Sequence, residues 1–141
     1  MTALRIDQGM ASAAAEALPA EVDRELRTRY RQLRVMLHTA GLAATYAFIA
    51  AKAKDTDGTG QGRPDKLAAA YQTAGEAIRK RLAARAMFPG GSEPRTARDV
   101  LAALGNMTQV EYARASTEAV ALAGWLSRLA DAVYVPGDGH G

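Results

Sequence analysis

Apolar residues recur at the spacing of a single helical face along most of this 141-residue chain. The clearest stripe is Val22, Leu26, Tyr30, Leu33 and Leu37. Residues three, four and seven positions apart share one side of a helix, whereas strand residues alternate at every second position. Alanine, leucine and arginine, which favour helices, dominate the composition, and β-branched residues are sparse. The pattern therefore predicts an all-α fold, a compact bundle of about five or six helices.

Glycine and proline mark where these helices should end. Gly41 marks a sharp break, because the apolar phase changes there, and Pro19 either ends the first helix or opens the second. Thr108 with Glu111 three residues later has the spacing of a capping box, which predicts the start of the last helix. We expect helices over residues 4–18, 20–38, 42–53, 64–87, 96–104 and 108–133, with loops at 55–64 and 89–94.

One helical domain should cover residues 1–135, followed by a flexible tail at 136–141. The inner faces of the helices predict a single core. We expect Trp125, Tyr30 and Tyr112 to pack in the interior and not to act as platforms for stacked bases. The core should contain Leu33, Leu37, Leu42, Phe48, Ile49, Leu122, Leu126 and Leu129.

The net charge is only +3, but the cations are placed unevenly. In the second predicted helix, four arginines form a stripe about 120° around the axis from the apolar stripe. Repeated cations of this kind suit nucleic-acid phosphates, although the same stripe can serve only as a solvated face. Lys52 ends the third predicted helix, and more cations crowd the end of the fourth. The candidate RNA-binding residues are Arg24, Arg27, Arg31, Arg34, Lys52, Arg79, Lys80 and Arg85.

Residues that could support catalysis or hold a metal are few. There is no cysteine, and His38 and His140 are the only histidines. The glycine-rich loop at 55–64 lacks the preceding strand and the lysine motif of a phosphate-binding loop. We therefore predict no catalytic residue, no metal site and no cofactor. Four carboxylates on polar helix faces are interpreted as solvated charges: Glu16, Glu25, Glu76 and Glu118.

The chain has no apolar run near the roughly 20 residues that span a bilayer. Its first ten residues do not form the apolar core of a signal peptide, because Asp7 and Gln8 interrupt it. We expect a cytoplasmic protein without a membrane partner.

The segment around Gly41 also resembles a helix-turn-helix, so a DNA-binding regulator is one alternative function. Its second helix would have to offer polar side chains to base edges in the major groove. Here that helix reads AATYAFIAAKA, which is almost wholly apolar. A helical adaptor that binds no nucleic acid is the other alternative.

The order and spacing of several short motifs resemble the small-subunit family of type III-B CRISPR effector complexes, the Cmr complexes. The likeness runs from Ile6 to about Ala132 and fails in the two loops. Arg34 stands where the family often has proline, and Ala40 where it often has asparagine. The matching positions are Leu33, Leu37, Gly41, Leu42, Ala47, Phe48, Lys52, Tyr112, Glu118, Ala119, Trp125, Leu126 and Arg128.

This resemblance implies an all-helical subunit without catalytic activity. Several copies would stack along the guide-RNA-bound backbone of a larger subunit and help form the channel for target RNA. The implied partners are the other subunits of the Cmr effector, guide and target RNA, and copies of the chain itself. The cleavage activities would belong to other subunits.

Overall fold

The computed structural model describes residues 2–54 and 66–136, and the side chains from residue 8 onward in those ranges. In this part of the chain there are helices and no strand, which confirms the all-α prediction. The predicted loop at 55–64 lies outside the described residues, as does the predicted tail except for Pro136. The elements are α1 Thr2–Ala17, α2 Arg24–Ala40, α3 Leu42–Lys52, α4 Lys66–Ala84, the 3-10 helix η1 Pro89–Gly91, α5 Ala97–Gly105 and α6 Gln109–Val133.

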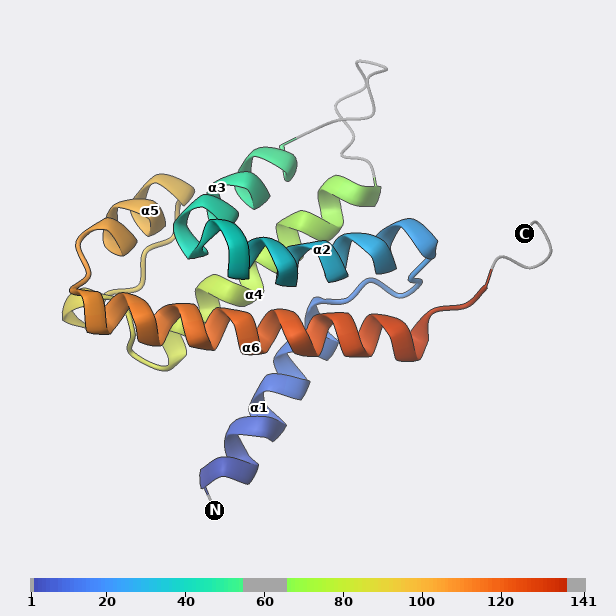
Figure 1. Cartoon of the computed structure of the whole chain (residues 1–141), viewed down its shortest axis with the longest axis horizontal. Helices are drawn as coiled ribbons and strands as arrows, with labels where there is room; N and C mark the ends of the chain where they lie inside the picture. The colour runs from blue at the N-terminus through green and yellow to red at the C-terminus, as the bar shows by residue number, and fades with distance from the viewer. Residues whose placement is uncertain (1, 55–65, 137–141) are drawn as a thin grey trace.

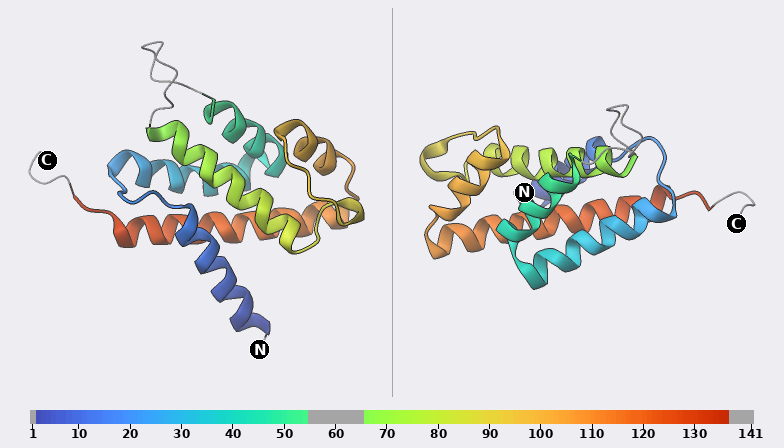
Figure 2. Two further views of the ribbon diagram at one scale, coloured as in Figure 1. Left: turned by 180° about the vertical axis from the view of Figure 1, so that it is seen from behind. Right: turned by 90° about the horizontal axis from the view of Figure 1, so that it is seen from above.

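Helix α6, 25 residues long, is the longest described element, and α1, α2, α3 and α4 all contact it. Figure 1 shows α2 running alongside α6, with α4 behind them and α3 and α5 together at one end. Helix α1 contacts both α6 and α4, and its N-terminal end extends beyond the other helices (Figures 1 and 2). The surface between α2 and α6 is therefore formed by segments about a hundred residues apart in the sequence.

One cluster of buried side chains joins the helices, as the apolar stripes predict. Phe48 and Leu129, which we expected inside this core, pack against it but stay partly exposed. The ring of Phe48 meets that of Tyr71 edge-on, with 5.7 Å between centroids. Tyr30 is a core residue, whereas Trp125 and Tyr112 are partly buried beside the core. Of the expected core residues, those buried in the cluster are Leu33, Leu37, Leu42, Ile49, Leu122 and Leu126.

Helix α2 begins at Arg24, four residues later than the sequence pattern predicted. Asp23 takes an extended conformation, and its carboxylate accepts a hydrogen bond from the Leu26 N–H at 2.9 Å. An aspartate in this position satisfies one of the free N–H groups at a helix start, so it sets the boundary. The same carboxylate forms an ion pair with Lys66 at the beginning of α4. Pro19 therefore ends the first helix and does not open the second.

The predicted break at Gly41 is confirmed, since α2 ends and α3 starts on either side of it. Gly41 has a φ of 96°, a conformation that glycine adopts far more readily than other residues. Glycine cannot cap α3 with a side chain, and the hydroxyl of Tyr112 takes over this role. It accepts a hydrogen bond from the Ala43 N–H at 2.9 Å. A residue of α6 thus stabilises the start of α3.

The start of α6 and the end of α4 also follow recognisable capping patterns. The predicted capping box is present, with Thr108 and Glu111 exchanging side-chain to backbone hydrogen bonds at the start of α6. After α4, the N–H of Met87 donates to the Leu82 carbonyl, and the N–H of Ala86 donates to the Ala83 carbonyl. This is a Schellman motif, in which Ala86, with a φ of 53°, occupies the position where glycine is usual.

Candidate nucleic-acid interface

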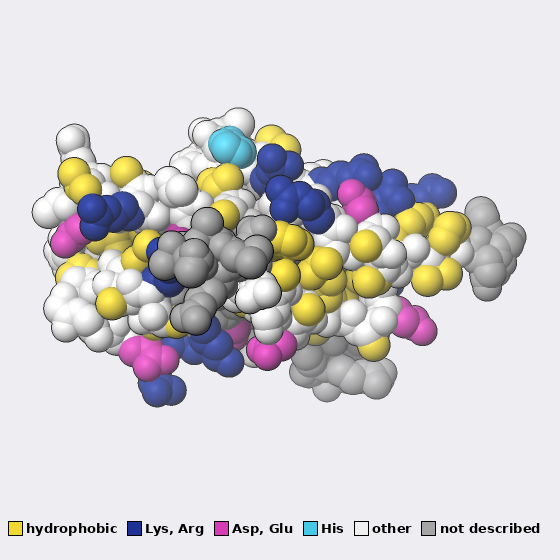
Figure 3. Space-filling model, turned by 90° about the horizontal axis from the view of Figure 1, so that it is seen from below, with side chains coloured by type: hydrophobic (Ala, Val, Ile, Leu, Met, Phe, Trp, Pro, Cys, Tyr) yellow, Lys and Arg dark blue, Asp and Glu magenta, His cyan; other side chains and the backbone are white. Residues whose placement is uncertain are grey.

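The arginine stripe of α2 faces away from the core, along the edge where α2 meets α6. Arg24, Arg31 and Arg34 are exposed, and Arg27 is half-buried. Figure 3 shows basic side chains gathered in a row over one side of the molecule. The structure thus places these four candidates together on a surface that a polyanion could reach.

A single carboxylate from α6 holds two of these arginines. Asp131 lies 3.4 Å from Nε of Arg27 and accepts a hydrogen bond from Arg31 at 3.2 Å. The guanidinium of Arg27 also lies over the ring of Tyr134, 4.3 Å from its centroid. Arg27 is therefore engaged inside the molecule, whereas Arg24 and Arg34 have no ion pair within the described residues.

A groove of about 470 Å³ separates α2 from α6 on this side, and we call it the α2–α6 groove. Three arginines and one aspartate are among the residues that line it, which leaves an excess of positive charge. The positive excess lies in a concave surface, where it attracts anions more strongly than scattered charges would. The lining residues are Arg31, Arg34, Val35, His38, Ser127, Arg128 and Asp131.

Arg128 is a groove residue that the reasoning about cationic stripes missed. It belongs to α6, a helix whose charges form no stripe, and it reaches the groove only because α6 packs beside α2. Its guanidinium lies over the ring of Trp125, 5.1 Å from the centroid. The spacing of Trp125 and Arg128, three residues apart on one helical face, was the signal available in the sequence.

Lys52 is not among the residues that line the α2–α6 groove. It is the last residue of α3, and helix rise over the ten steps from Leu42 places it about 15 Å from the start of that helix. Its Nζ lies 5.7 Å from the centre of the Phe48 ring. The expectation that Lys52 lies near the α2 stripe stays a prediction.

The three candidates from the end of α4 lie in three different settings. Arg79 is buried, with a side chain only 7 % exposed, and donates to the Glu76 carboxylate at 2.6 Å and to the Pro94 carbonyl at 3.2 Å. It holds the segment after η1 to α4 and presents no free surface to RNA. Arg85 lies 3.5 Å from the carboxylate of Glu118. Arg79 is therefore held inside the fold, whereas Arg85 is exposed and RNA binding by it stays a prediction.

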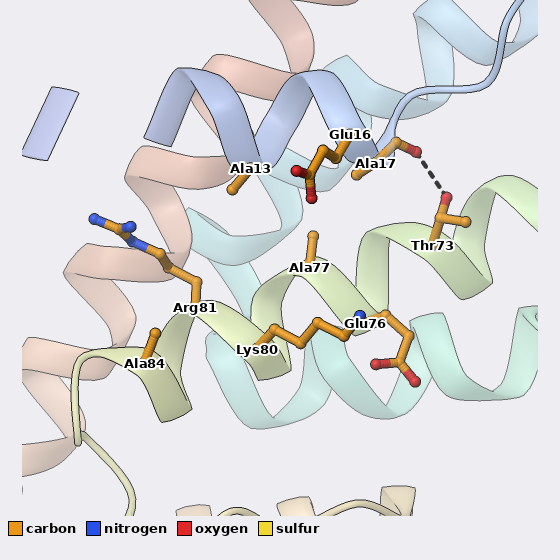
Figure 4. A pocket seen from close by; sticks show the side chains of 9 residues that line it. All are labelled: Ala13, Glu16, Ala17, Thr73, Glu76, Ala77, Lys80, Arg81 and Ala84. Carbon is orange, nitrogen blue, oxygen red and sulfur yellow. Dashed lines mark hydrogen bonds between the residues drawn. The ribbon is translucent and has the colours of Figure 1, made fainter. Parts of the chain in front are cut away.

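Lys80 is exposed and lines a second hollow, of about 390 Å³, between α1 and α4. Figure 4 shows its floor of alanines, with Glu16 on the α1 side and Lys80 on the α4 side. Thr73 closes one end by donating a hydrogen bond to the Ala17 carbonyl at 2.9 Å. The hollow carries both signs of charge, so it lacks the cationic character of the α2–α6 groove.

Glu118 is not the solvated carboxylate that the sequence suggested. Its side chain is 9 % exposed and accepts a hydrogen bond from Nε of Arg81 at 2.8 Å. Residue 118 was expected to be exposed because the residues around it on α6 do not indicate that α4 covers this face. Arg81 belongs to α4 and Arg85 directly follows it, so this cluster fastens the C-terminal end of α4 to α6.

Residues 6–133 match the model of a protein family described as CRISPR-associated protein (Cas_Cmr5). The match runs from α1 to the last residue of α6 and so covers most of the chain. The chain belongs to this family. The resemblance to the small subunit of type III-B CRISPR effectors is thereby confirmed. No curated protein and no solved structure matches the chain.

Several residues that carry the family likeness connect helices in the structure. Tyr112 of α6 caps α3, and Glu118 of α6 binds Arg81 of α4. Trp125 lies under the guanidinium of Arg128 within α6 itself. Gly41 is the break that brings α3 back onto α4. The family motifs thus mark contacts between helices and, at Arg128, the edge of the α2–α6 groove.

Across residues 8–54 and 66–136, no group of three or more His, Asp or Glu side chains is placed to hold a metal ion. In the same part of the chain, no helix combines the length and the apolar character needed to cross a bilayer.

Proposed function

We propose that this chain is a non-catalytic small subunit of a Cmr ribonucleoprotein effector and that it helps to bind target RNA through the α2–α6 groove. Membership of the Cmr5 family supports assembly with the other subunits of a CRISPR Cmr complex. In this proposal several copies stack along the guide-RNA backbone. The contribution to antiviral defence is to hold RNA, while other subunits carry out cleavage.

The observation that carries the proposal is the row of arginines beside a groove with a positive excess. Arg24 and Arg34 are exposed and have no carboxylate within ion-pair distance among the described residues. An arginine that neutralises no internal charge leaves its five N–H donors available to phosphate oxygens. A surface of this kind binds a nucleic-acid backbone without reading its sequence.

The geometry of α3 does not support the alternative of a helix-turn-helix regulator. The helix buries Leu42, Tyr46 and Ile49 in the core. Its exposed residues include Ala44 and Ala47, which have no hydrogen-bonding side chain to read a base. An adaptor that binds no nucleic acid remains an outcome of the test below.

The test is charge reversal of Arg24 and Arg34 in the reconstituted effector complex. These two are chosen because reversing Arg27 or Arg31 would also break the ion pairs with Asp131 and loosen α2 from α6. The double variant Arg24→Glu and Arg34→Glu should assemble with guide RNA as the wild type does. Its affinity for target RNA should fall, and the dependence of log affinity on log salt should weaken by about 0.7 per lost phosphate contact.

A matched control makes the same two arginine-to-glutamate substitutions at other exposed positions. Arg98 on α5 and Arg114 near the start of α6 are exposed and lie outside the α2–α6 groove. Replacing both with glutamate should leave target capture nearly unchanged. Equal capture by wild type and groove variant would refute RNA binding here and favour the adaptor. Equal loss in both variants would show that only overall charge matters.

A further inference from the structure

The arginine stripe of α2 continues into a histidine at the end of the helix. Members of the stripe are three or four residues apart, and the next position at that spacing after Arg34 is His38. Residues at these spacings share one face of a helix. His38 lies in the last turn of α2, its side chain is exposed, and it lines the α2–α6 groove. It therefore extends the cationic face as a residue whose charge depends on pH.

Three arginines and one aspartate line the groove together with His38. Arg31 and Arg34 come from the same helix, and Arg128 and Asp131 come from α6. Asp131 already neutralises part of the charge of two arginines. Within the described residues, the side chain of His38 has no hydrogen bond or ion pair. Its ring nitrogens are thus available to a ligand that enters the groove.

An imidazole in such surroundings takes up a proton more readily when an anion is bound beside it. An unperturbed histidine side chain titrates near pH 6.5, within the physiological range. In the empty groove the neighbouring guanidinium groups oppose one more positive charge, whereas a bound phosphate favours it and accepts its hydrogen bond. The carboxyl end of a helix also favours an imidazolium. Phosphate binding and proton uptake should therefore be linked.

We propose that His38 is a further RNA-contacting residue of the α2–α6 groove, and that its imidazolium donates a hydrogen bond to a phosphate of the bound strand. The inference rests on the proposed function, which supplies the identity of the ligand. It adds a proton to the binding reaction, because the subunit takes one up as RNA enters the groove. The affinity for RNA then rises as the pH falls from 8 to 6.

The size of this effect follows from the linkage. A rise of about one pH unit in the protonation midpoint of an imidazole, from near 6.5, corresponds to an affinity about sixfold higher at pH 6 than at pH 8. Carboxylates, lysines and arginines keep their ordinary charge over this range. Among the described residues that line the groove, histidine is the only type that ordinarily titrates there.

The first arm of the test measures the binding of a fluorescent oligouridine to the full chain at pH 8, 7 and 6, at constant ionic strength. Oligouridine is chosen because neither its bases nor its phosphodiesters titrate in this range. The wild type should bind about sixfold more tightly at pH 6 than at pH 8. His38→Gln should show a flat profile, with the affinity of the wild type at pH 8. His38→Arg should also be flat, with an affinity no weaker than that of the wild type at pH 6.

The matched control is His140→Gln, which removes the other histidine of the sequence. It should keep the full pH dependence of the wild type. A pH dependence that survives in His38→Gln, a flat profile in the wild type, or the absence of saturable binding would overturn the proposal. Melting temperatures recorded at pH 6 and pH 8 show that each variant is folded under the conditions of binding.

The second arm needs no variant, so it does not depend on the folding of one. The ring-proton NMR signal of His38 is followed against pH with and without saturating oligouridine. The protonation midpoint should rise by about one pH unit when RNA is bound. An unchanged or lowered midpoint would overturn the contact.

These measurements also separate the contact from the proposed function. If Arg24→Glu with Arg34→Glu abolishes target capture in the complex but the midpoint of His38 does not move, the histidine contact fails while the proposed function stands. If the midpoint rises with oligouridine but the arginine pair leaves target capture intact, the proposed function fails. In that case the histidine contact stands for RNA bound to the isolated chain.

Discussion

Replacing Glu118 with alanine should cost this fold far more than the loss of an ordinary surface carboxylate. Glu118 accepts from Arg81 at 2.8 Å and lies 3.5 Å from Arg85, with its own side chain 9 % exposed. Arg81 is 14 % exposed and lies under α1, where a Cβ on Gly9 would come within 2.9 Å of its Nη1. The variant would leave a nearly buried guanidinium without its acceptor, between three helices.

The expected magnitude follows from burial. Removing one partner of a fully buried ion pair costs about 3–5 kcal/mol, because the other charge stays desolvated. Arg85 is 36 % exposed, so water can partly replace the lost carboxylate there. We therefore expect Glu118→Ala to lower the free energy of unfolding by about 2–3 kcal/mol. For a chain of this length, that corresponds to a fall in melting temperature of roughly 10 °C.

Urea denaturation followed by circular dichroism measures this change, provided that the m-value stays constant. The matched control is Glu25→Ala, which removes a carboxylate 3.7 Å from Arg29 with both side chains more than a third exposed. That loss should stay within about 0.5 kcal/mol. The double variant Glu118→Met with Arg81→Met should recover part of the stability, because it leaves no unpaired charge from that pair. A cost for Glu118→Ala no larger than that of the control would refute the reasoning.

Three further predictions can be checked by the same denaturation measurements. Tyr112→Phe should lower the free energy of unfolding by about 1 kcal/mol, because it removes the acceptor of the Ala43 N–H. Tyr30→Phe should be neutral or stabilising, because the buried Tyr30 hydroxyl has no partner among the described residues. The reverse order would contradict both assignments. Ala86→Gly should stabilise by about 1 kcal/mol, since it relieves a left-handed alanine, and a loss of stability would show that the Schellman turn is wrong. The pKa of Asp23 is held below its ordinary value by a backbone hydrogen bond at the start of α2 and by a neighbouring lysine. Its contribution is therefore present above the unfolded-state pKa of about 4 and is lost as pH falls through the folded-state pKa, so Asp23→Asn should flatten the acid side of a stability–pH profile.

Helices could be predicted from this sequence more reliably than the places where they meet. Periodicity located six helices, and Gly41 and Thr108 set boundaries because their local chemistry decides a helix end. The start of α2 was missed because Asp23, the true cap, was read as part of a helix that began earlier. The sequence does contain the capping aspartate, but the apolar pattern that includes Val22 indicated an earlier helix start.

The site was less predictable, because burial of a charge depends on helices distant in the sequence. Arg79 and Glu118 resemble solvated residues in their own helices, and only packing against other segments buries them. Arg128 reaches the groove through the same kind of long-range packing, as does Asp131, which pairs with an arginine a hundred residues earlier. The stripe on α2 could be found from one helix, whereas a groove between two helices could not.

Crosslinking of target RNA within the assembled Cmr complex tests the central claim most directly. Aromatic rings lie beside two arginines here: Trp125 beside Arg128, which lines the groove, and Tyr134 beside Arg27 of the α2 stripe. Photoactivated thiouridine in the target strand should therefore mark peptides from α2 and the second half of α6 in this subunit. It should leave α5 unmarked. Crosslinks confined to α5 or to the hollow between α1 and α4, with none along the α2–α6 groove, would contradict the account.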